Sequence, residues 1–413
     1  MSKKFSQEEG RISMKKYQII RVISLSSILL LTFNLSHAHD STYYKHMNAD
    51  ITVVRESPLT ELITIEYDEN FTDYGFPGNG SKENPYRIEN YSINALEYHN
   101  GIVIINTTKH FIIQNCNLMA FFSAIYIENV SDGTAVIREN TLLKSDFGLV
   151  VMNSNGVQII NNICGPYNEY GIFLPRTSNS LVKQNTGFQN IYNAIRSVKS
   201  VSNIYMDNNC SNNFNTGITL EKDSNASAIN NICNNNLRGG IFKVTNSTIK
   251  GNRFDNNYHY GSLLTTIKSS TVSYNLFCFN AEYGCLAEDV DNSTFIGNYF
   301  ENNTLYGLLL DEYSSNNLVY HNSFIGNKPD GTSQARDNGE VGGNKWYRQE
   351  LKEGNYWSEW QQSKPYPIDG TAESVDKYPL NSSLERLNIK FAYFMISLLL
   401  IGITSIVRRK FLQ

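Results

Sequence analysis

The chain has 413 residues, of which 41% are hydrophobic and 18% are charged, and its formal net charge is −4 at pH 7. This composition suits a folded protein with a sizeable core and excludes an intrinsically disordered chain. It also argues against a nucleic-acid-binding protein, because phosphate contacts need clustered Lys and Arg and this chain has no basic field.

Residues 1–38 have the features of a secretory signal peptide. A basic stretch precedes the apolar run VISLSSILLLTF, and Ser36-His37-Ala38 has the small-x-small pattern of a cleavage site. The alternative is an uncleaved anchor helix, because the basic region is long. Residues 39–100 then form an N-terminal segment that we expect to cap the repeats that follow, since the ends of a solenoid need covering.

Residues 101–329 contain a repeat of about 23 residues. Ten units fit, and each begins with Gly or Ala. These first positions are Gly101, Ala124, Gly148, Gly171, Ala194, Gly217, Gly240, Gly261, Gly284 and Gly307. In most units the second and fourth positions are apolar, as in Ile102 and Ile104. This alternation is typical of a β-strand with one face inward.

An Asn recurs ten to twelve residues after this strand in most units, at Asn115, Asn162, Asn185, Asn208, Asn231, Asn275 and Asn298. Asn tolerates the left-handed backbone and hydrogen-bonds its neighbours, so we expect a ladder of stacked Asn side chains. Units this short cannot bury their apolar residues alone and must stack. The predicted fold is therefore an all-β parallel β-helix; a leucine-rich repeat has a similar period, but its consensus is absent.

The third position of the units is expected to face outward, yet it often holds an aromatic or apolar residue. Tyr126, Phe173 and Phe242 are the aromatic examples. Exposed aromatic stripes on a solenoid suit sugar rings, so these residues are predicted to bind carbohydrate. The competing interpretation is ordinary β-propensity on a sheet that loops partly cover.

Acidic residues gather in the last units. The repeat places Glu288 over Asp311 and Asp289 over Glu312, with Asp291 nearby. Such a group suits an acid/base pair for glycosidic cleavage or a bound Ca²⁺, and it equally suits solvated turn residues. The repeat frame shows no Arg or Lys beside these carboxylates to hold a uronate sugar.

The chain has six Cys residues. Cys210 and Cys233 have the same offset in consecutive units, which places their Cα atoms about one strand spacing apart, within reach of a disulfide. Two buried free thiols are the alternative. The seven His residues are scattered, and no His-Met or His-Cys pair recurs at a common offset, so no metal site is predicted from the residues themselves.

Residues 330–385 contain all three Trp residues, Trp346, Trp357 and Trp360. We expect them to form a lid over the open end of the core; the functional alternative is a platform for sugar stacking at Trp357 and Trp360. Residues 386–413 include the uncharged run FAYFMISLLLIGITSIV and then Arg408, Arg409 and Lys410. This segment is predicted to be a single transmembrane anchor with a cytoplasmic tail.

Twelve Asn-x-Ser/Thr sequons are consistent with an exported glycoprotein, although a chain this rich in Asn, Ser and Thr also produces them by chance.

Three segments carry a family resemblance: GNGSKENPYRIENYSI, the G-I-x-L units, and GNYWSEW followed by KPYPIDG and VDKYPL. Over residues 61–380 the chain resembles the NosD-like right-handed parallel β-helix proteins, also described as carbohydrate-binding and sugar-hydrolase (CASH) domains. The resemblance implies a right-handed, three-sided helix at the cell surface or in the periplasm, and the name-giving member implies a copper-maturation accessory role. The Asp- and Gly-rich stretch that relatives often carry before PYPI is missing, which argues against a calcium site of that kind.

The sequence thus favours an exported, membrane-anchored β-helix that binds glycans or cell-envelope proteins without catalysis. The alternatives are a polysaccharide hydrolase or lyase that uses the carboxylates of the last units, and a NosD-like copper-maturation protein. No resident cofactor is predicted beyond the Ca²⁺ considered above.

Overall fold

The computed structural model describes residues 62–97, 99–327, 332–361 and 364–383. The predicted signal peptide at 1–38 and the predicted anchor at 386–413 lie outside these residues. Within the described part of the chain, no helix is long and apolar enough to cross a membrane.

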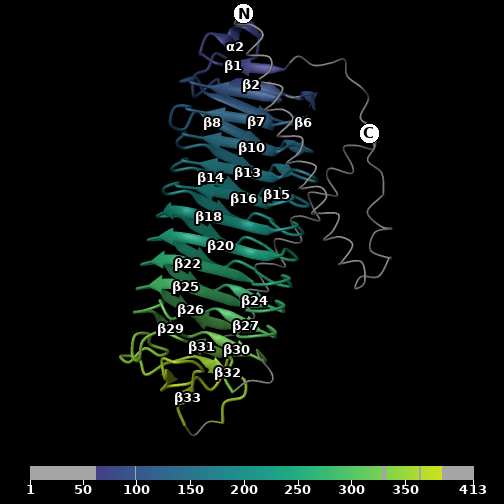
Figure 1. Ribbon diagram of the computed structural model, residues 1–413. Coiled ribbons are helices and arrows are strands. Elements are labelled where there is room, and N and C mark those ends of the chain that lie inside the picture. Colours follow the sequence, from purple (N-terminus) through teal and green to yellow (C-terminus); the bar gives the residue numbers. More distant parts are fainter. Residues whose placement is uncertain (1–61, 98, 328–331, 362–363, 384–413) are drawn as a thin grey trace, which may run out of the picture. The chain divides into compact units, whose positions relative to one another are not determined.

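The described residues form a parallel β-helix with three faces, whose coils stack one above another (Figure 1). The first face is a twelve-stranded sheet of β1 (Ile63–Ile65), β4 (Ile102–Ile105), β7 (Ser123–Glu128), β10 (Phe147–Met152), β13 (Tyr170–Pro175), β16 (Asn193–Val198), β18 (Thr216–Ser224), β20 (Arg238–Thr245), β22 (Ser262–Lys268), β25 (Cys285–Asp291), β28 (Leu308–Leu310) and β31 (Ala335–Asp337). Each strand between β1 and β31 pairs in parallel with the strands one coil before and after it.

The second face is an eleven-stranded sheet of β2 (Tyr86–Glu89), β5 (Phe111–Gln114), β8 (Ala135–Arg138), β11 (Gln158–Ile160), β14 (Leu181–Lys183), β17 (Ile204–Met206), β19 (Ser227–Ile229), β21 (Thr248–Lys250), β23 (Thr271–Ser273), β26 (Thr294–Ile296) and β29 (Leu318–Tyr320).

The third face begins with a five-stranded sheet of β3 (Ser92–Ala95), β6 (Asn117–Ala120), β9 (Thr141–Leu143), β12 (Ile163–Cys164) and β15 (Thr186–Gly187). Single-residue bridges from Asn209 to Leu276 connect it to a four-stranded sheet. This second part contains β24 (Leu276–Cys278), β27 (Tyr299–Glu301), β30 (Ser323–Ile325) and β32 (Tyr356–Trp357). The remaining elements are the one-turn helix α2 (Asn70–Asp73) and the antiparallel pair β33 (Tyr366–Pro367) and β34 (Val375–Asp376).

The predicted architecture is confirmed, and the alternation of side chains explains it. Inward positions such as Ile102, Ile104, Leu308 and Leu310 are fully buried. The small first position of each coil is required because a Cβ atom on Gly101, for example, would lie 2.5 Å from the carbonyl oxygen of Ala124 in the next coil. The solenoid extends beyond residues 101–329: β1, β2 and β3 precede this range, and β31 and β32 follow it.

The predicted Asn ladder is present, with one member placed wrongly. In most steps, as from Asn162 to Asn185, the Asn side-chain amide donates to the side-chain oxygen of the next Asn at 2.9–3.1 Å. The ladder also includes Asn140, Asn252, Asn322 and Asn355. Asn115 lies outside it with φ +53°, and Cys116 takes its inward position. The prediction was wrong there because the Asn at the left-handed corner and the Asn of the ladder are sequence neighbours.

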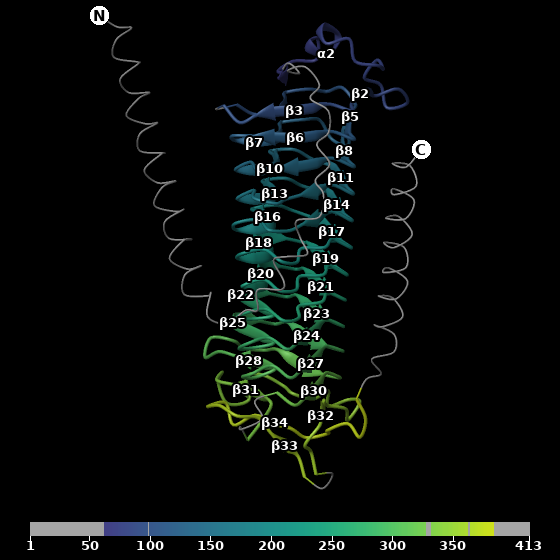
Figure 2. The ribbon, with the colours of Figure 1, turned by 90° about the vertical axis from the view of Figure 1, so that its right-hand side faces the viewer.

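The inward-facing residues of the third face change from small to aromatic along the stack of coils. Its inward row holds the small residues Cys164, Gly187, Cys210 and Cys233, and then Phe254, Phe277, Phe300, Phe324 and Trp357. The aromatic rings stack on one another from coil to coil, with centroids 5.3, 5.0, 4.8 and 4.3 Å apart. Figure 2 shows these coils from β20 down to β32. The C-terminal half of the core therefore contains a continuous aromatic column.

Phe242 points into the core, contrary to the prediction that it faces outward. Strand pairing places Thr219 opposite Ile241 and Leu220 opposite Phe242, so the coil begins at Gly239 and not at Gly240. Phe242 is fully buried and contacts Phe254 edge to face. A ring in this position cannot bind a surface carbohydrate.

The three Trp residues divide between core and surface. Trp346 and Trp357 are each 1% exposed, and Trp357 stacks between Phe324 and Tyr366 at 4.3 and 4.0 Å. Trp360 is partly buried against the same core, and its ring N–H donates to the carbonyl oxygen of Lys364. Trp357 therefore covers the end of the core and offers no surface to a sugar.

Candidate functional site

The outward-facing positions of the twelve-stranded sheet form the candidate site, called the outer face below. Two rows of side chains run along it from coil to coil. The first row lies just before the small residue of each coil and holds Phe147, Tyr170, Asn193, Thr216 and Arg238. The second row holds Tyr126, Val150, Phe173, Arg196, Thr219, Ile241, Leu263, Leu286, Leu309 and Arg336.

A cluster of aromatic side chains lies on the N-terminal half of the outer face. It consists of Phe147, Tyr170, Phe173, Tyr192 and Arg196 and is called the aromatic patch. The Phe147 ring stacks on Tyr170 at 5.3 Å and on Phe173 at 5.5 Å, and Tyr170 contacts Tyr192 at 5.2 Å. All five side chains are partly exposed.

Arg196 fixes the C-terminal side of this patch. Its guanidinium group lies over the rings of Tyr170 and Phe173, at 5.6 and 5.9 Å from their centroids. It donates to the Tyr170 hydroxyl at 3.2 Å and forms an ion pair with Glu221 at 3.1 Å. The positive charge is therefore balanced within the patch, and the rings are held in a fixed arrangement.

The predicted carbohydrate residues Tyr126 and Phe173 both lie on the outer face and are partly exposed. The Tyr126 hydroxyl donates to Glu128 at 2.6 Å, and burial together with this neighbouring carboxylate raises the pKa of the phenol. Sequence reasoning missed Phe147, Tyr170 and Arg196. It followed the aromatic residues of the third position only, whereas the residue just before each small first position also faces outward.

The predicted carboxylates occupy two neighbouring coils at the C-terminal half of the outer face. Glu288 is an exposed residue in the middle of β25, and its pKa is raised by partial burial and then by the charges of Asp311 and Glu312. Lys243 acts in the opposite direction on the same pKa, so a cation does accompany this group. The expectation that no Lys or Arg lies beside these carboxylates was wrong, because Lys243 of β20 is near enough for its charge to lower the pKa of Glu288.

Asp311 has a structural task in the turn after β28. One of its oxygens accepts the backbone N–H of Asp289 at 3.0 Å, the backbone N–H of Tyr313 at 3.2 Å and the hydroxyl of Ser314 at 2.7 Å. Asp289 has φ +52° and forms the corner of its own coil, while Glu312 is exposed. These bonds match the solvated-turn alternative for Asp289 and Asp311. Across the described residues, no three His, Cys, Asp or Glu side chains come together in a way that suits a metal ion.

Cys210 and Cys233 lie in consecutive coils, and both are buried free thiols. The predicted disulfide is absent. In a parallel ladder the two Cβ atoms point the same way at about 4.8 Å, wider than the ~3.8 Å typical of a disulfide. Burial, and then the neighbouring Cys210, raise the pKa of Cys233 well above its ordinary value, so this thiol is poorly suited to metal binding as a thiolate.

Several sequons coincide with corners of the coils. Asn106, Asn129, Asn225, Asn246 and Asn292 are exposed and have φ between +49° and +53°. A corner needs a residue that tolerates the left-handed backbone, and the strand that follows favours Thr or Ser. The fold therefore accounts for this pattern without glycosylation.

Comparisons with known proteins agree with this geometry. Residues 197–361 match the family described as periplasmic copper-binding protein (NosD), and residues 100–248 match the family described as right handed beta helix region. A search of curated proteins finds no significant match.

Solved structures with a similar fold include the Dettilon tailspike protein, with 13% identity and a TM-score of 0.45 over 65% of this chain and 66% of that chain. The A-module of the Azotobacter vinelandii mannuronan C-5 epimerase AlgE4 has 12% identity and a TM-score of 0.40, with 72% and 87% covered. PfbA, a surface adhesin of Streptococcus pneumoniae, has 12% identity and a TM-score of 0.39, with 58% and 72% covered.

The resemblance to NosD-like right-handed parallel β-helix proteins is therefore confirmed for the residues that these two family matches cover.

Proposed function

We propose that this protein is a non-catalytic β-helix that binds carbohydrate at the aromatic patch of its outer face. The proposal depends on one observation: the aromatic stack begins abruptly at Phe147. The strand partner of Phe147 in the preceding coil is the small, buried Ser123, whereas its partner in the next coil is Tyr170. The side of the Phe147 ring toward Ser123 thus has no aromatic partner across the strand and is where a sugar ring would lie.

The charge of the patch selects the kind of sugar. Because Glu221 neutralises Arg196, the patch offers rings, phenol hydroxyls and a paired cation. We expect neutral glycans to bind better than uronate-rich glycans, since an added carboxylate would compete with Glu221 for Arg196.

The test is a glycan-array screen of the full chain, followed by titration of the best neutral glycan. Phe147→Ala is expected to weaken binding at least about tenfold, because aromatic anchors dominate such interfaces. Tyr274→Ala is the control, since Tyr274 is 48% exposed and follows β23 on another face. Equal affinity of Phe147→Ala and wild type would contradict the proposal, and so would binding that Tyr274→Ala weakens equally.

A polysaccharide-cleaving activity is the second candidate, and the raised pKa of Glu288 favours it. A carboxyl group that stays protonated closer to neutral pH suits a general acid. Release of new reducing ends, lost in Glu288→Gln and retained in Glu301→Gln, would support this candidate. The absence of release from every glycan that binds the patch would exclude it.

A copper role does not fit the residues that are described. Copper needs soft or imidazole ligands grouped together, and among these residues no three His, Cys, Asp or Glu side chains come together in a way that suits a metal ion. The buried Cys side chains face the core, where burial raises the pKa of Cys116 to about 11 and disfavours the thiolate.

The proposal also includes a cellular location for the β-helix. Export directed by residues 1–38 and anchoring by residues 386–413 would hold the β-helix outside the cytoplasm, where glycans and cell-envelope proteins are available. Cell fractionation and protease protection of the full chain test this; a protected, cytoplasmic β-helix would exclude it.

A further inference from the structure

In the part of the chain that the structure describes, the first strand of the twelve-stranded sheet has one edge without a strand partner. Among the described residues, β1 pairs with β4 on one side and with no strand on the other. On its other side the carbonyl oxygen of Leu62 and the N–H groups of Thr64 and Glu66 bond to side chains and not to a strand. Groups of this kind form a template on which another chain can add a strand, and proteins usually protect them.

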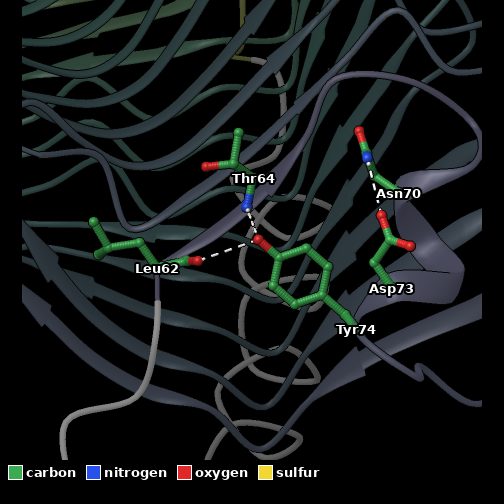
Figure 3. A pocket seen from close by; sticks show the side chains of 5 residues that line it. All are labelled: Leu62, Thr64, Asn70, Asp73 and Tyr74. Atoms are coloured by element: carbon green, nitrogen blue, oxygen red, sulfur yellow. Dashed lines mark hydrogen bonds between the residues drawn. The ribbon is translucent and has the colours of Figure 1, made fainter.

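Here the protection comes from side chains of the N-terminal cap. A depression of about 520 Å³ lies beside this edge and is lined by Leu62, Thr64, Asn70, Asp73 and Tyr74 (Figure 3). The N–H of Thr64 donates to the Tyr74 hydroxyl at 3.0 Å, and that hydroxyl donates to the carbonyl oxygen of Leu62 at 3.4 Å. A single hydroxyl thus accepts one hydrogen bond and donates another, as a residue of a neighbouring strand would.

Asn70 continues this arrangement at the next backbone groups. Its side-chain oxygen accepts the N–H groups of Glu66 at 3.1 Å and Tyr67 at 3.2 Å. Its side-chain amide donates to Asp73 at 3.1 Å, which sets the orientation of the group. Two side chains therefore bind four backbone groups between Leu62 and Tyr67.

We propose that Tyr74 and Asn70 act as substitutes for a β-strand and prevent a second copy of this chain from pairing with β1. The occupant of the exposed edge would be the β1 edge of another copy. The two β1 edges of such a pair present the same alternating hydrogen-bond donors and acceptors. The acidic side chains of this edge, Glu66 and Asp73, lie at its end and not along β1.

The Tyr74 ring makes this testable without disrupting the cap. It stacks on Phe76 at 5.3 Å with an interplanar angle of 8°, and Phe76 is buried. Tyr74→Phe keeps this packing and removes only the hydroxyl. Tyr67→Phe is the matched control, because Tyr67 is 59% exposed in the same segment.

Hydrogen exchange of the full chain, followed by mass spectrometry on peptides that cover residues 62–66, measures the protection of the edge. Sedimentation over a range of protein concentrations measures association. We expect Tyr74→Phe to exchange the Thr64 amide about tenfold faster than wild type and to self-associate as its concentration rises, and Tyr67→Phe to do neither. Unchanged exchange at Thr64, or faster exchange without association, would overturn the proposal.

A rescue variant separates edge pairing from general misfolding. Thr64→Pro on the Tyr74→Phe background removes the outward N–H, and Pro is tolerated at such an edge position. We expect this double variant to return to the sedimentation behaviour of wild type. Association that persists in the double variant would show that the contact lies elsewhere and would refute the role of β1.

Discussion

The two ends of the solenoid are closed in different ways. At the N-terminal end, the edge of β1 is satisfied by the side chains of Tyr74 and Asn70. At the C-terminal end, backbone groups of the cap cover the last strands: the N–H of Asp337 donates to the carbonyl oxygen of Asp369, and that of Val319 to Lys345, both at 2.8 Å.

This difference determines how each end can fail. A backbone hydrogen bond survives most substitutions, whereas a side-chain hydrogen bond is lost when one residue changes. We therefore expect substitutions at the N-terminal end to change the self-association of the protein. Substitutions at the C-terminal end, where large side chains cover the core, should instead lower the free energy of unfolding.

The largest effect is expected from Trp357→Ala at the C-terminal end. The substitution removes the ring between Phe324 and Tyr366, and it also removes the indole N–H that donates to the buried Asp376 at 2.9 Å. We expect a loss near the upper end of ~3–5 kcal/mol in the free energy of unfolding, measured by urea denaturation. Trp360→Ala should cost less, because Trp360 is only partly buried; equal losses would contradict a specific role for the lid.

Phe71→Ala tests the corresponding residue at the N-terminal end. Phe71 is fully buried and stacks on Tyr86 at 4.6 Å, so the substitution leaves a cavity under α2. Because no buried carboxylate loses a partner there, we expect a loss near the lower end of ~3–5 kcal/mol in the same urea experiment. A loss larger than that of Trp357→Ala would reverse the ranking of the two ends.

Asp68→Ala is expected to have a smaller effect. Asp68 holds the N-terminal cap on the next coil by accepting bonds from the Thr107 hydroxyl, the Thr108 N–H and the Thr108 hydroxyl, at 2.6–2.8 Å. These bonds are partly exposed to water, so we expect about 1–2 kcal/mol lost in urea denaturation. Asp132→Ala, at an exposed turn, is the control and should stay within about 0.5 kcal/mol of wild type.

The smallest effect is a difference in pH dependence between the ends. Burial raises the pKa of Asp376 to about 6 from an ordinary value of 3.8, so its contribution to stability is present below pH 3.8 and is lost as the pH rises through about 6. The pKa of Asp68 is lowered: partial burial raises it, but the bonds from Thr108 and Thr107 together outweigh burial. Its contribution is present above pH 3.8 and is lost as the pH falls through its folded-state pKa.

Chemical denaturation at several pH values tests this contrast. Asp223 in the interior also has a pKa raised to about 6 by burial, so Asp376→Asn alone should reduce the slope of stability between pH 4 and 7, and Asp376→Asn with Asp223→Asn should reduce it further. Asp68→Asn should remove only the loss below pH 4. A slope that neither substitution changes would contradict these assignments.

The β-helix could be predicted from local features of the chain. Alternating apolar residues, a small residue at the start of each coil and Asn at the corners together indicate one coil, because their effects are complete within a few residues. The Trp residues could also be recognised as a lid, since a solenoid of this kind must cover its open end.

The positions of particular surface residues could not be predicted in this way. The length of a coil varies: Leu220 pairs with Phe242, so this coil begins at Gly239, one residue before the position that the repeat pattern indicates, and Phe242 lies in the core. The stack of Phe147, Tyr170 and Arg196 and the protection of β1 by Tyr74 join residues of different coils or of a loop and a strand. Such contacts depend on where the folded chain returns in space, so local sequence patterns specify the coils while the stacking of the coils specifies the candidate site.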